Sequence, residues 1–402
     1  MQLNRPYILM IIGGLLVVAL LAVWVYLLFF RTAPEQDDRF ANLDLGPEND
    51  PALATSTPEA ATSTEDRPRV ALGDGLQQLT TTPVAGFREV ARGSSSAPLL
   101  FYVDAGTGHI HTIDMETGER TRRSNLTIPD ITQVNFSPDG TYVAGLVGEQ
   151  REKRLFVAAL ATSSEQIDPT YVTDLVLDFA IMDTERLLYT TRTNSGTDVK
   201  SVSLADLTSE DLFSTVLRDV TIAWGQSATA THYFYPKPSR WLEGSLYAVR
   251  NGVTERVPAR GLGLTAVAFD TGVAFNHYDQ DEREYIPQIL RSATATRPVQ
   301  APVVALPEKC TASRQQPTVY WCGHESVARE RALPDVWYRG EVSFSDTLWR
   351  VNARLRSAVP LVDLETESGR PLDVTALAPA ADETGLYFID KNDRTLWHYD
   401  IP

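Results

Sequence analysis

Phe136-Ser137-Pro138-Asp139-Gly140-Thr141-Tyr142-Val143-Ala144 is the stretch of the sequence that decides the fold. An apolar run over residues 132–136 leads into Ser137-Pro138-Asp139-Gly140, and a second apolar run follows over residues 142–146. Proline and an Asp-Gly pair are typical of a tight turn, because proline presets its own φ and glycine tolerates a positive φ. The stretch therefore predicts a hairpin of two short antiparallel strands.

A third strand follows this hairpin, and versions of it recur along the chain. The clearest are Leu348-Trp349-Arg350-Val351-Asn352 and Leu396-Trp397-His398-Tyr399-Asp400, whose starts are 48 residues apart. Weaker versions start at Ile110, Leu155, Val199, Leu246 and Ile286. Four short antiparallel strands that repeat at about 40–50 residues are the signature of a β-propeller. We therefore expect an all-β fold over residues 76–402, a seven-bladed β-propeller of four-stranded antiparallel blades.

The two ends of this domain are out of phase with the repeat. The last repeat supplies only three strands, over residues 374–378, 386–390 and 396–401, whereas residues 76–82 precede the first complete repeat. Because a blade needs four strands, we expect residues 76–82 to complete the last blade and thereby to close the ring.

Residues 136–144 resemble the "FSPDGxxxA" pattern that opens a blade in the TolB-like and Trp-Asp-repeat-like propeller families. Pro379, Asp382 and Gly385 form a looser version of the pattern in the last repeat. The resemblance implies the propeller fold and a tendency to bind proteins or peptides. It carries no catalytic residue onto this chain, because a fold alone does not give a function.

Residues 7–30 contain no charged side chain. As a helix they span about 36 Å, enough to cross a hydrocarbon core of roughly 30 Å. A cleaved signal peptide is the alternative, but its apolar region is shorter and ends at small residues, whereas this run ends in Trp24-Val25-Tyr26-Leu27-Leu28-Phe29-Phe30. We expect an uncleaved signal anchor and a single-pass protein of the cell membrane. Residues 1–6 are too short to hold a domain, so we expect a cytoplasmic leader there and an extracytoplasmic propeller domain.

Residues 31–75 differ in composition from the rest of the chain. They are rich in proline, threonine, serine and acidic residues and contain few large apolar residues. Such a segment cannot bury enough surface to offset the entropy of ordering it, so we expect a disordered acidic linker. The whole chain carries a net charge of −16. Nucleic-acid binding is therefore not expected, because phosphate binding requires a basic surface.

Few residues carry a signal for chemistry. Cys310 and Cys322 fall on consecutive strands of the sixth repeat, where an oxidising exterior favours a disulfide; two buried thiols are the alternative. His109 and His111 share one face of a strand but lack a third metal ligand. Asp279-Gln280-Asp281-Glu282 lacks the glycine and the distal glutamate of an EF-hand loop. We expect no metal, no cofactor and no catalytic residue, although a triad assembled across blades stays open.

The loops between second and third strands gather on one rim of a propeller, and loops on a rigid scaffold are where binding usually occurs. Three successive blades have enlarged or aromatic versions, the sixth as an insertion over residues 324–346. Because Trp, Tyr and Arg are enriched at interface hot spots, we expect a binding surface made of Arg240, Trp241, Tyr278, Arg329, Arg331, Trp337 and Tyr338. The alternative is that Trp337 and Tyr338 pack the insertion onto the disc.

Two functions from different classes fit these features. The first is a membrane-anchored, extracytoplasmic propeller that binds a protein or an envelope polymer as a non-catalytic binding or scaffold module. The alternative is a cell-envelope enzyme acting on glycan or peptide in the central funnel, which would need paired carboxylates there. A propeller that assists the assembly of a secretion or pilus machine is a variant of the first function.

Overall fold

The structure is a computed structural model that describes residues 70, 72–93, 96–148, 153–160, 166–325 and 332–402. The expected leader, the membrane span over residues 7–30 and nearly all of the linker lie outside these residues. In the described part of the chain, no helix is both long and apolar enough to cross a membrane. The chain divides into Met1–Thr64 and Glu65–Pro402, and the second unit is the one described below.

This unit consists almost entirely of short strands. They are, in chain order, β1 (Leu76–Gln78), β2 (Val84–Arg92), β3 (Ser96–Asp104), β4 (Ile110–Asp114), β5 (Arg120–Arg122), β6 (Ile131–Phe136), β7 (Tyr142–Val147), β8 (Arg154–Ala159), β9 (Thr170–Ile181), β10 (Arg186–Arg192), β11 (Thr197–Ser203), β12 (Ser209–Thr215), β13 (Val220–Ala223), β14 (His232–Pro236), β15 (Glu243–Arg250), β16 (Val253–Phe269), β17 (Gly272–Asp279), β18 (Glu284–Leu290), β19 (Val299–Gln300), β20 (Cys310–Ala312), β21 (Val319–His324), β22 (Thr347–Asn352), β23 (Ser357–Asp363), β24 (Val374–Pro379), β25 (Gly385–Asp390) and β26 (Leu396–Asp400). The helices are the 3-10 turn η1 (Pro307–Lys309), α2 (Asp335–Tyr338) and α3 (Leu364–Ser368).

The strand predictions are confirmed. The recurrent third strand of each repeat is a strand of the structure: β4, β8, β11, β15, β18, β22 and β26. The hairpin that decided the fold joins β6 to β7, and the amide of Gly140 donates to the Ser137 carbonyl at 2.9 Å. Gly140 has a φ of 70°, which only glycine adopts without strain. The Ser-Pro-Asp-Gly sequence therefore makes the turn that its composition indicates.

The strands form three four-stranded sheets and two seven-stranded sheets, all with antiparallel neighbours. Each seven-stranded sheet contains one long strand that changes partners along its length. In β9, residues Thr170 to Leu175 pair with β8 and residues Val176 to Ile181 pair with β10. In β16, the residues up to Leu262 pair with β15 and the rest with β17. A long strand thus runs from the last position of one four-stranded group to the first position of the next.

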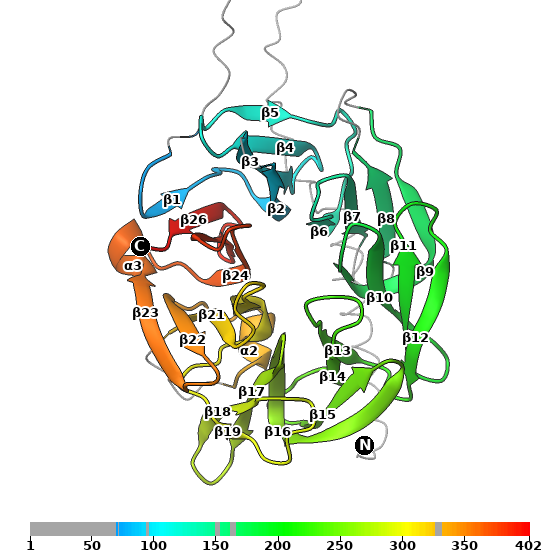
Figure 1. Cartoon of the computed structure of the whole chain (residues 1–402), viewed down its shortest axis with the longest axis vertical. Coiled ribbons are helices and arrows are strands. Elements are labelled where there is room, and N and C mark those ends of the chain that lie inside the picture. The colour runs from blue at the N-terminus through cyan, green and yellow to red at the C-terminus, as the bar shows by residue number, and fades with distance from the viewer. Residues whose placement is uncertain (1–69, 71, 94–95, 149–152, 161–165, 326–331) are drawn as a thin grey trace, which may run out of the picture. The chain divides into compact units, whose positions relative to one another are not determined.

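The first described strand completes the last sheet, whose strand order is β1-β26-β25-β24 (Figure 1). Leu76, Gln77 and Gln78 are paired with Tyr399, His398 and Trp397. This pairing confirms the prediction for the start of residues 76–82.

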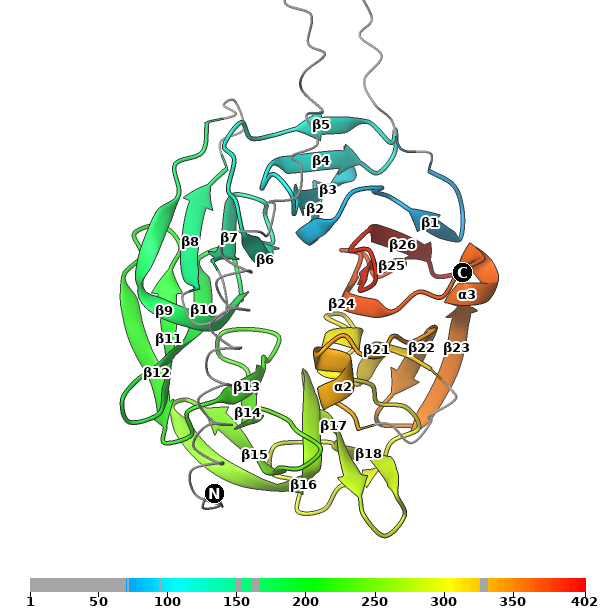
Figure 2. The same cartoon turned by 180° about the vertical axis from the view of Figure 1, so that it is seen from behind.

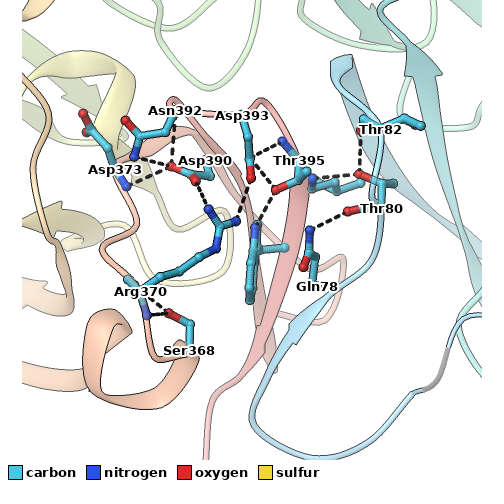
Figure 3. A network of polar contacts seen from close by, with 12 residues as sticks. Gln78, Thr80, Thr82, Ser368, Arg370, Asp373, Asp390, Asn392, Asp393 and Thr395 are labelled. Carbon is cyan, nitrogen blue, oxygen red and sulfur yellow. Dashed lines mark hydrogen bonds and ion pairs between the residues drawn. The ribbon is translucent and has the colours of Figure 1, made fainter.

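Thr80, just after β1, links the start of the domain to β26 by a hydrogen bond. Its hydroxyl accepts from the Leu396 amide at 3.0 Å and donates to the Thr82 carbonyl at 3.0 Å (Figure 3). Leu79, 1% exposed, packs in the same apolar cluster as Leu396. The two ends of the domain are therefore held together by backbone pairing, side-chain hydrogen bonds and apolar burial.

Apolar clusters fill the spaces between neighbouring groups of strands, which are arranged around a central axis (Figures 1 and 2). Each cluster joins two groups that are consecutive in the chain, and one joins the first group to the last. Pairs within the clusters are Phe101 with Phe136, Val157 with Tyr189, Phe213 with Phe234, Tyr235 with Phe275, Phe269 with Tyr320, Trp321 with Phe388, and Tyr102 with Tyr387. The contacts thus return to their starting point, and the described domain is a closed ring.

Glycine permits the closest approach between inner strands of this ring. A Cβ added to Gly86 on β2 would lie 2.1 Å from the carbonyl oxygen of Val134 on β6. No side chain fits at that distance, so this position requires glycine for reasons of packing rather than of φ.

Candidate functional site

The loops that the sequence singled out do meet on one rim of the ring. The backbone amide of Arg240, after β14, donates to the Asp335 carboxylate of α2 at 2.6 Å. The Arg240 guanidinium lies over the ring of Tyr278 at the end of β17. The Tyr285 hydroxyl of β18 donates to the carbonyl of Leu333, just before α2. The turn after β14, the paired ends of β17 and β18 and the segment around α2 are therefore tied together, although the fifth repeat contributes strand residues, Tyr278 and Tyr285, rather than the expected loop.

Trp241 is the most exposed aromatic side chain of this surface. It is 79% exposed, and Leu242 beside it is 49% exposed. The turn that carries Trp241 is nonetheless fixed: the Leu242 amide donates to the Ser239 carbonyl at 3.0 Å, and the Gly263 amide donates to the same carbonyl at 2.9 Å. A large apolar side chain is thus presented to solvent on backbone that is already ordered.

The other predicted residues have different environments. Trp337 is 3% exposed, and its indole N–H donates to Asp373 at 2.9 Å. This burial agrees with the alternative expectation, in which Trp337 packs the insertion onto the propeller. Tyr338 is 39% exposed, and its hydroxyl donates to Glu308 at 3.3 Å. Arg329 and Arg331 lie outside the described residues.

A buried ion cluster holds the insertion in place, and nothing in the sequence pointed to it. Lys309 of η1 is 2% exposed, and its ammonium group contacts the carboxylates of both Asp346 and Asp373. Asp373 also accepts from the Phe344 amide at 3.1 Å and from the Trp337 indole. Because an uncompensated charge at this depth is costly, these three charged residues depend on one another. They fix the segment that carries α2 and hence Tyr338.

Burial dominates the electrostatics of Asp346. Desolvation raises the pKa of its carboxyl to about 6, against the opposing effect of Lys309. Asp346 Oδ2 accepts from the Val374 amide at 2.8 Å, whereas Oδ1 has no hydrogen-bond partner among the described residues. Asp346 and Lys309 line a cavity of about 100 Å³ together with Asn276 and His324. A cavity of this size has room for water.

A polar network continues from this cluster toward the clasp, by which we mean the pairing of β1 with β26 together with the hydrogen bonds of Thr80 (Figure 3). The Asp373 amide donates to Asp390 Oδ1 at 3.0 Å. Arg370 lies between two carboxylates, with Nη1 3.2 Å from Asp390 Oδ2 and Nη2 donating to Asp393 Oδ2 at 2.8 Å. The insertion and the closing strand are thus attached to opposite ends of one network in the last sheet.

The inner strands surround a channel-like cavity of about 740 Å³. Asp178 of β9 and Glu308 of η1 line it, and desolvation raises the pKa of both carboxyls. The charge of Asp178 adds to the rise at Glu308. The Trp224 indole donates to Asp178 at 3.2 Å, and Gln133 donates to it at 3.4 Å. Two carboxyl groups with a raised pKa therefore line the same cavity.

The remaining candidates have structural surroundings. Cys310 and Cys322 are paired across β20 and β21 and form a disulfide, with their Cα atoms 4.1 Å apart. His111 stacks on Tyr102. Asp279 accepts from two backbone amides of its own loop, which lowers the pKa of its carboxyl. Within the described ranges, no group of three or more His, Cys, Asp or Glu side chains is arranged to hold a metal ion.

No family model matches this chain, and no curated protein matches it. Solved structures do match it. The oligogalacturonate lyase of Vibrio parahaemolyticus is 12% identical with a TM-score of 0.54, over 81% of this chain and 93% of that one. The Cps50 (Swd1) β-propeller domain of Myceliophteria thermophila is 11% identical with a TM-score of 0.52, over 81% and 100%.

The β-propeller domain of the Trilobed protease from Pyrococcus furiosus is 11% identical with a TM-score of 0.50, over 80% of this chain and 97% of that one. That domain is described as having an open velcro topology, whereas β1 and β26 are hydrogen bonded here. At these identities the likeness concerns the fold alone. It confirms that this chain has a β-propeller fold, and it does not distinguish an enzyme from a binding module.

Proposed function

We propose that this protein is a membrane-anchored, extracytoplasmic β-propeller that binds a protein or an envelope polymer without catalysing a reaction. The observation that carries the proposal is Trp241, 79% exposed on a turn that hydrogen bonds hold to Gly263 of β16. Aromatic side chains on ordered backbone bind with little loss of entropy, and they are common hot spots. Arg240 and the exposed Tyr338 complete the proposed surface, whereas Tyr278 is buried and supports Arg240 from below.

We further infer that the ring has seven blades. Dividing β9 after Leu175 and β16 at Leu262 turns the two long sheets into four four-stranded groups, which join the three sheets that already have four strands. Seven apolar clusters among the described residues, one for each junction of such a ring, support this count.

The proposed location rests on the sequence before the domain. The uncharged run over residues 7–30 is the proposed single-pass anchor, with its N-terminus in the cytoplasm, and residues 31–75 are the proposed tether. A tether keeps the binding head near the membrane and raises its effective concentration toward neighbouring molecules. Assistance in the assembly of an envelope machine is one form that such binding takes.

A truncation of the exposed indole tests the proposal. Trp241→Ala should abolish the capture of a partner by chemical crosslinking in intact membranes, while the midpoint of thermal unfolding changes by no more than a degree or two. Leu355→Ala is the matched control, because Leu355 is a 66% exposed apolar residue in the turn between β22 and β23. Unchanged capture by the Trp241 variant, or a large loss of stability, would refute a binding role for this side chain.

The enzymatic alternative is favoured by one observation. Asp178 and Glu308 share the channel, and both have a raised pKa, as a general acid does in glycoside hydrolysis. Release of new reducing ends from envelope glycan by the intact protein, and its loss in Glu308→Gln, would support this alternative. Equal release by that variant would exclude Glu308 from catalysis.

A further inference from the structure

Two arginine side chains face the same channel from distant parts of the chain. Arg88 lies on β2, and Arg314 lies in the turn between β20 and β21. Both line the cavity of about 740 Å³ described above. Arg88 is half-buried, whereas Arg314 is exposed. The channel therefore contains a basic pair besides the Asp178 and Glu308 carboxyls.

Neither guanidinium is paired with a carboxylate. Among the described residues, no acidic oxygen lies within 4.0 Å of the Arg88 or Arg314 side chain. Arg88 Nη1 donates to the Phe136 carbonyl at 3.1 Å, which orients the group without neutralising it. The pair thus keeps its positive charge in a concave site.

The acidic groups whose charges act on the two arginines, Asp139 and Glu383, already accept hydrogen bonds. Glu383 accepts from the backbone amide of Arg314 at 2.6 Å and from the Ser313 hydroxyl at 2.6 Å. Asp139 accepts from the Ser137 hydroxyl at 2.6 Å and from the Thr141 hydroxyl at 2.8 Å. The carboxylates of Glu383 and Asp139 act on the arginine pair through their charges alone. Neither carboxylate can rotate to form an ion pair with a guanidinium without losing these hydrogen bonds.

The positive charge of Arg314 acts on Arg88. Burial lowers the pKa of Arg88 to about 9, and the charge of Arg314 is the second cause. The pKa of Arg314 is also lowered, by partial desolvation in the cavity against the opposing charge of Glu383. An anion between the groups would relieve the repulsion and satisfy the donors that face the channel, because a guanidinium binds carboxylate and phosphate oxygens in a bidentate manner.

We propose that Arg88 and Arg314 form an oxyanion-binding site in the central channel, which takes a carboxylate or phosphate group of an acidic ligand. The site is separate from the rim around Trp241 and does not depend on the function proposed for that rim. Asn135 lines the same cavity and offers an amide donor for the neutral part of such a ligand.

Calorimetric titration of the full-length protein with inorganic phosphate and, separately, with citrate tests this site. Total ionic strength is held constant with chloride, because simple screening also weakens charge repulsion. The two arms distinguish a phosphate site from a carboxylate site. We expect saturable binding of at least one probe, and Arg314→Gln should weaken it about tenfold or more, the loss expected for one charge-assisted contact.

Three further variants make the result decisive. Arg88→Gln should weaken binding as Arg314→Gln does, and if its lost bond to Phe136 prevents folding, the Arg314 variant decides alone. Arg260→Gln, at an exposed arginine 3.6 Å from Glu243, should bind within twofold of the parent. Trp241→Ala should also bind normally, which separates this site from the rim. Absence of saturable binding by either anion, or equal binding by the Arg314 variant, would overturn the proposal.

Without an anion, Arg314→Gln should also unfold at the same temperature as the parent protein or at a higher one, because it removes a repulsive charge. A purely structural role for Arg314 predicts the opposite, a lower midpoint with or without phosphate.

Discussion

Replacing Asp346 by asparagine should change how the stability of the propeller depends on pH. The Asp346 carboxyl is fully buried, and its desolvation raises the pKa from 3.8 to about 6 in spite of Lys309. The native state therefore binds more protons than the unfolded state between these two values. The stabilisation that follows is fully present below pH 3.8, and it is lost as the pH rises through 6.

The magnitude follows from the same two values. One pKa unit corresponds to about 1.4 kcal/mol, so the carboxyl at position 346 contributes roughly 3 kcal/mol less at neutral pH than in strong acid. Roughly 2 kcal/mol of this loss falls between pH 4.5 and 7.5. Asparagine does not ionise, and its amide oxygen can still accept from Val374. The free energy of unfolding of Asp346→Asn, relative to the parent, should therefore rise by about 2 kcal/mol over this range.

Urea unfolding followed by tryptophan fluorescence, at half-unit steps of pH, measures this difference. Asp393→Asn is the control: hydrogen bonds from Thr395 and Arg370 lower the pKa of Asp393, so its difference from the parent should stay constant above pH 4.5. A constant difference for Asp346→Asn, or one that falls with rising pH, would show that the attraction of Lys309 outweighs desolvation and would refute the reasoning.

Three further predictions concern the closed ring. Thr80→Val removes two buried hydrogen bonds of the clasp and should lower the free energy of unfolding by about 1–3 kcal/mol in urea titrations, and no loss would show that the clasp hydroxyl is dispensable. Gly86→Ala should destabilise the fold by several kcal/mol or prevent soluble expression, whereas Gly106→Ala, where the nearest atom is 3.4 Å from the new Cβ, should be tolerated; equal melting temperatures would contradict the close packing of β2 on β6. Reduction of the Cys310–Cys322 bond should lower the midpoint of thermal unfolding without dissociating β20 from β21, and a midpoint insensitive to reductant would contradict a stabilising role.

Much of the fold could be predicted from the sequence because its signals are local. Strand, turn and strand recur with similar spacing, and each is marked by neighbouring residues such as Pro138 and Gly140. The clasp followed from counting strands, since the last repeat lacked one. The merging of strands into β9 and β16 was not predicted. Between Leu175 and Val176 the chain passes from one group to the next with no turn residue to mark the change.

The site was predictable only in part. The proximity of Arg240 and Trp241 to Tyr278 followed from the repeat, although Tyr278 lies on β17 and not on a loop. The environment of Trp337 did not, because an aromatic residue in a loop can pack inward or face solvent. The partners of Lys309 lie 37 and 64 residues away in the chain, and the sequence alone gives no signal that two aspartates converge on it. Arg88 and Arg314 are likewise far apart in the sequence. The closure of the ring brings them to one channel.

A photoreactive phenylalanine analogue placed at residue 241 of the full-length protein, and at residue 355 as control, tests the proposed binding surface most directly. On irradiation of intact cells, we expect a single crosslinked species of reproducible mass from position 241, and none from position 355. Identical crosslinking from the two positions, or none from position 241 while position 355 reacts, would contradict a recognition surface on this rim.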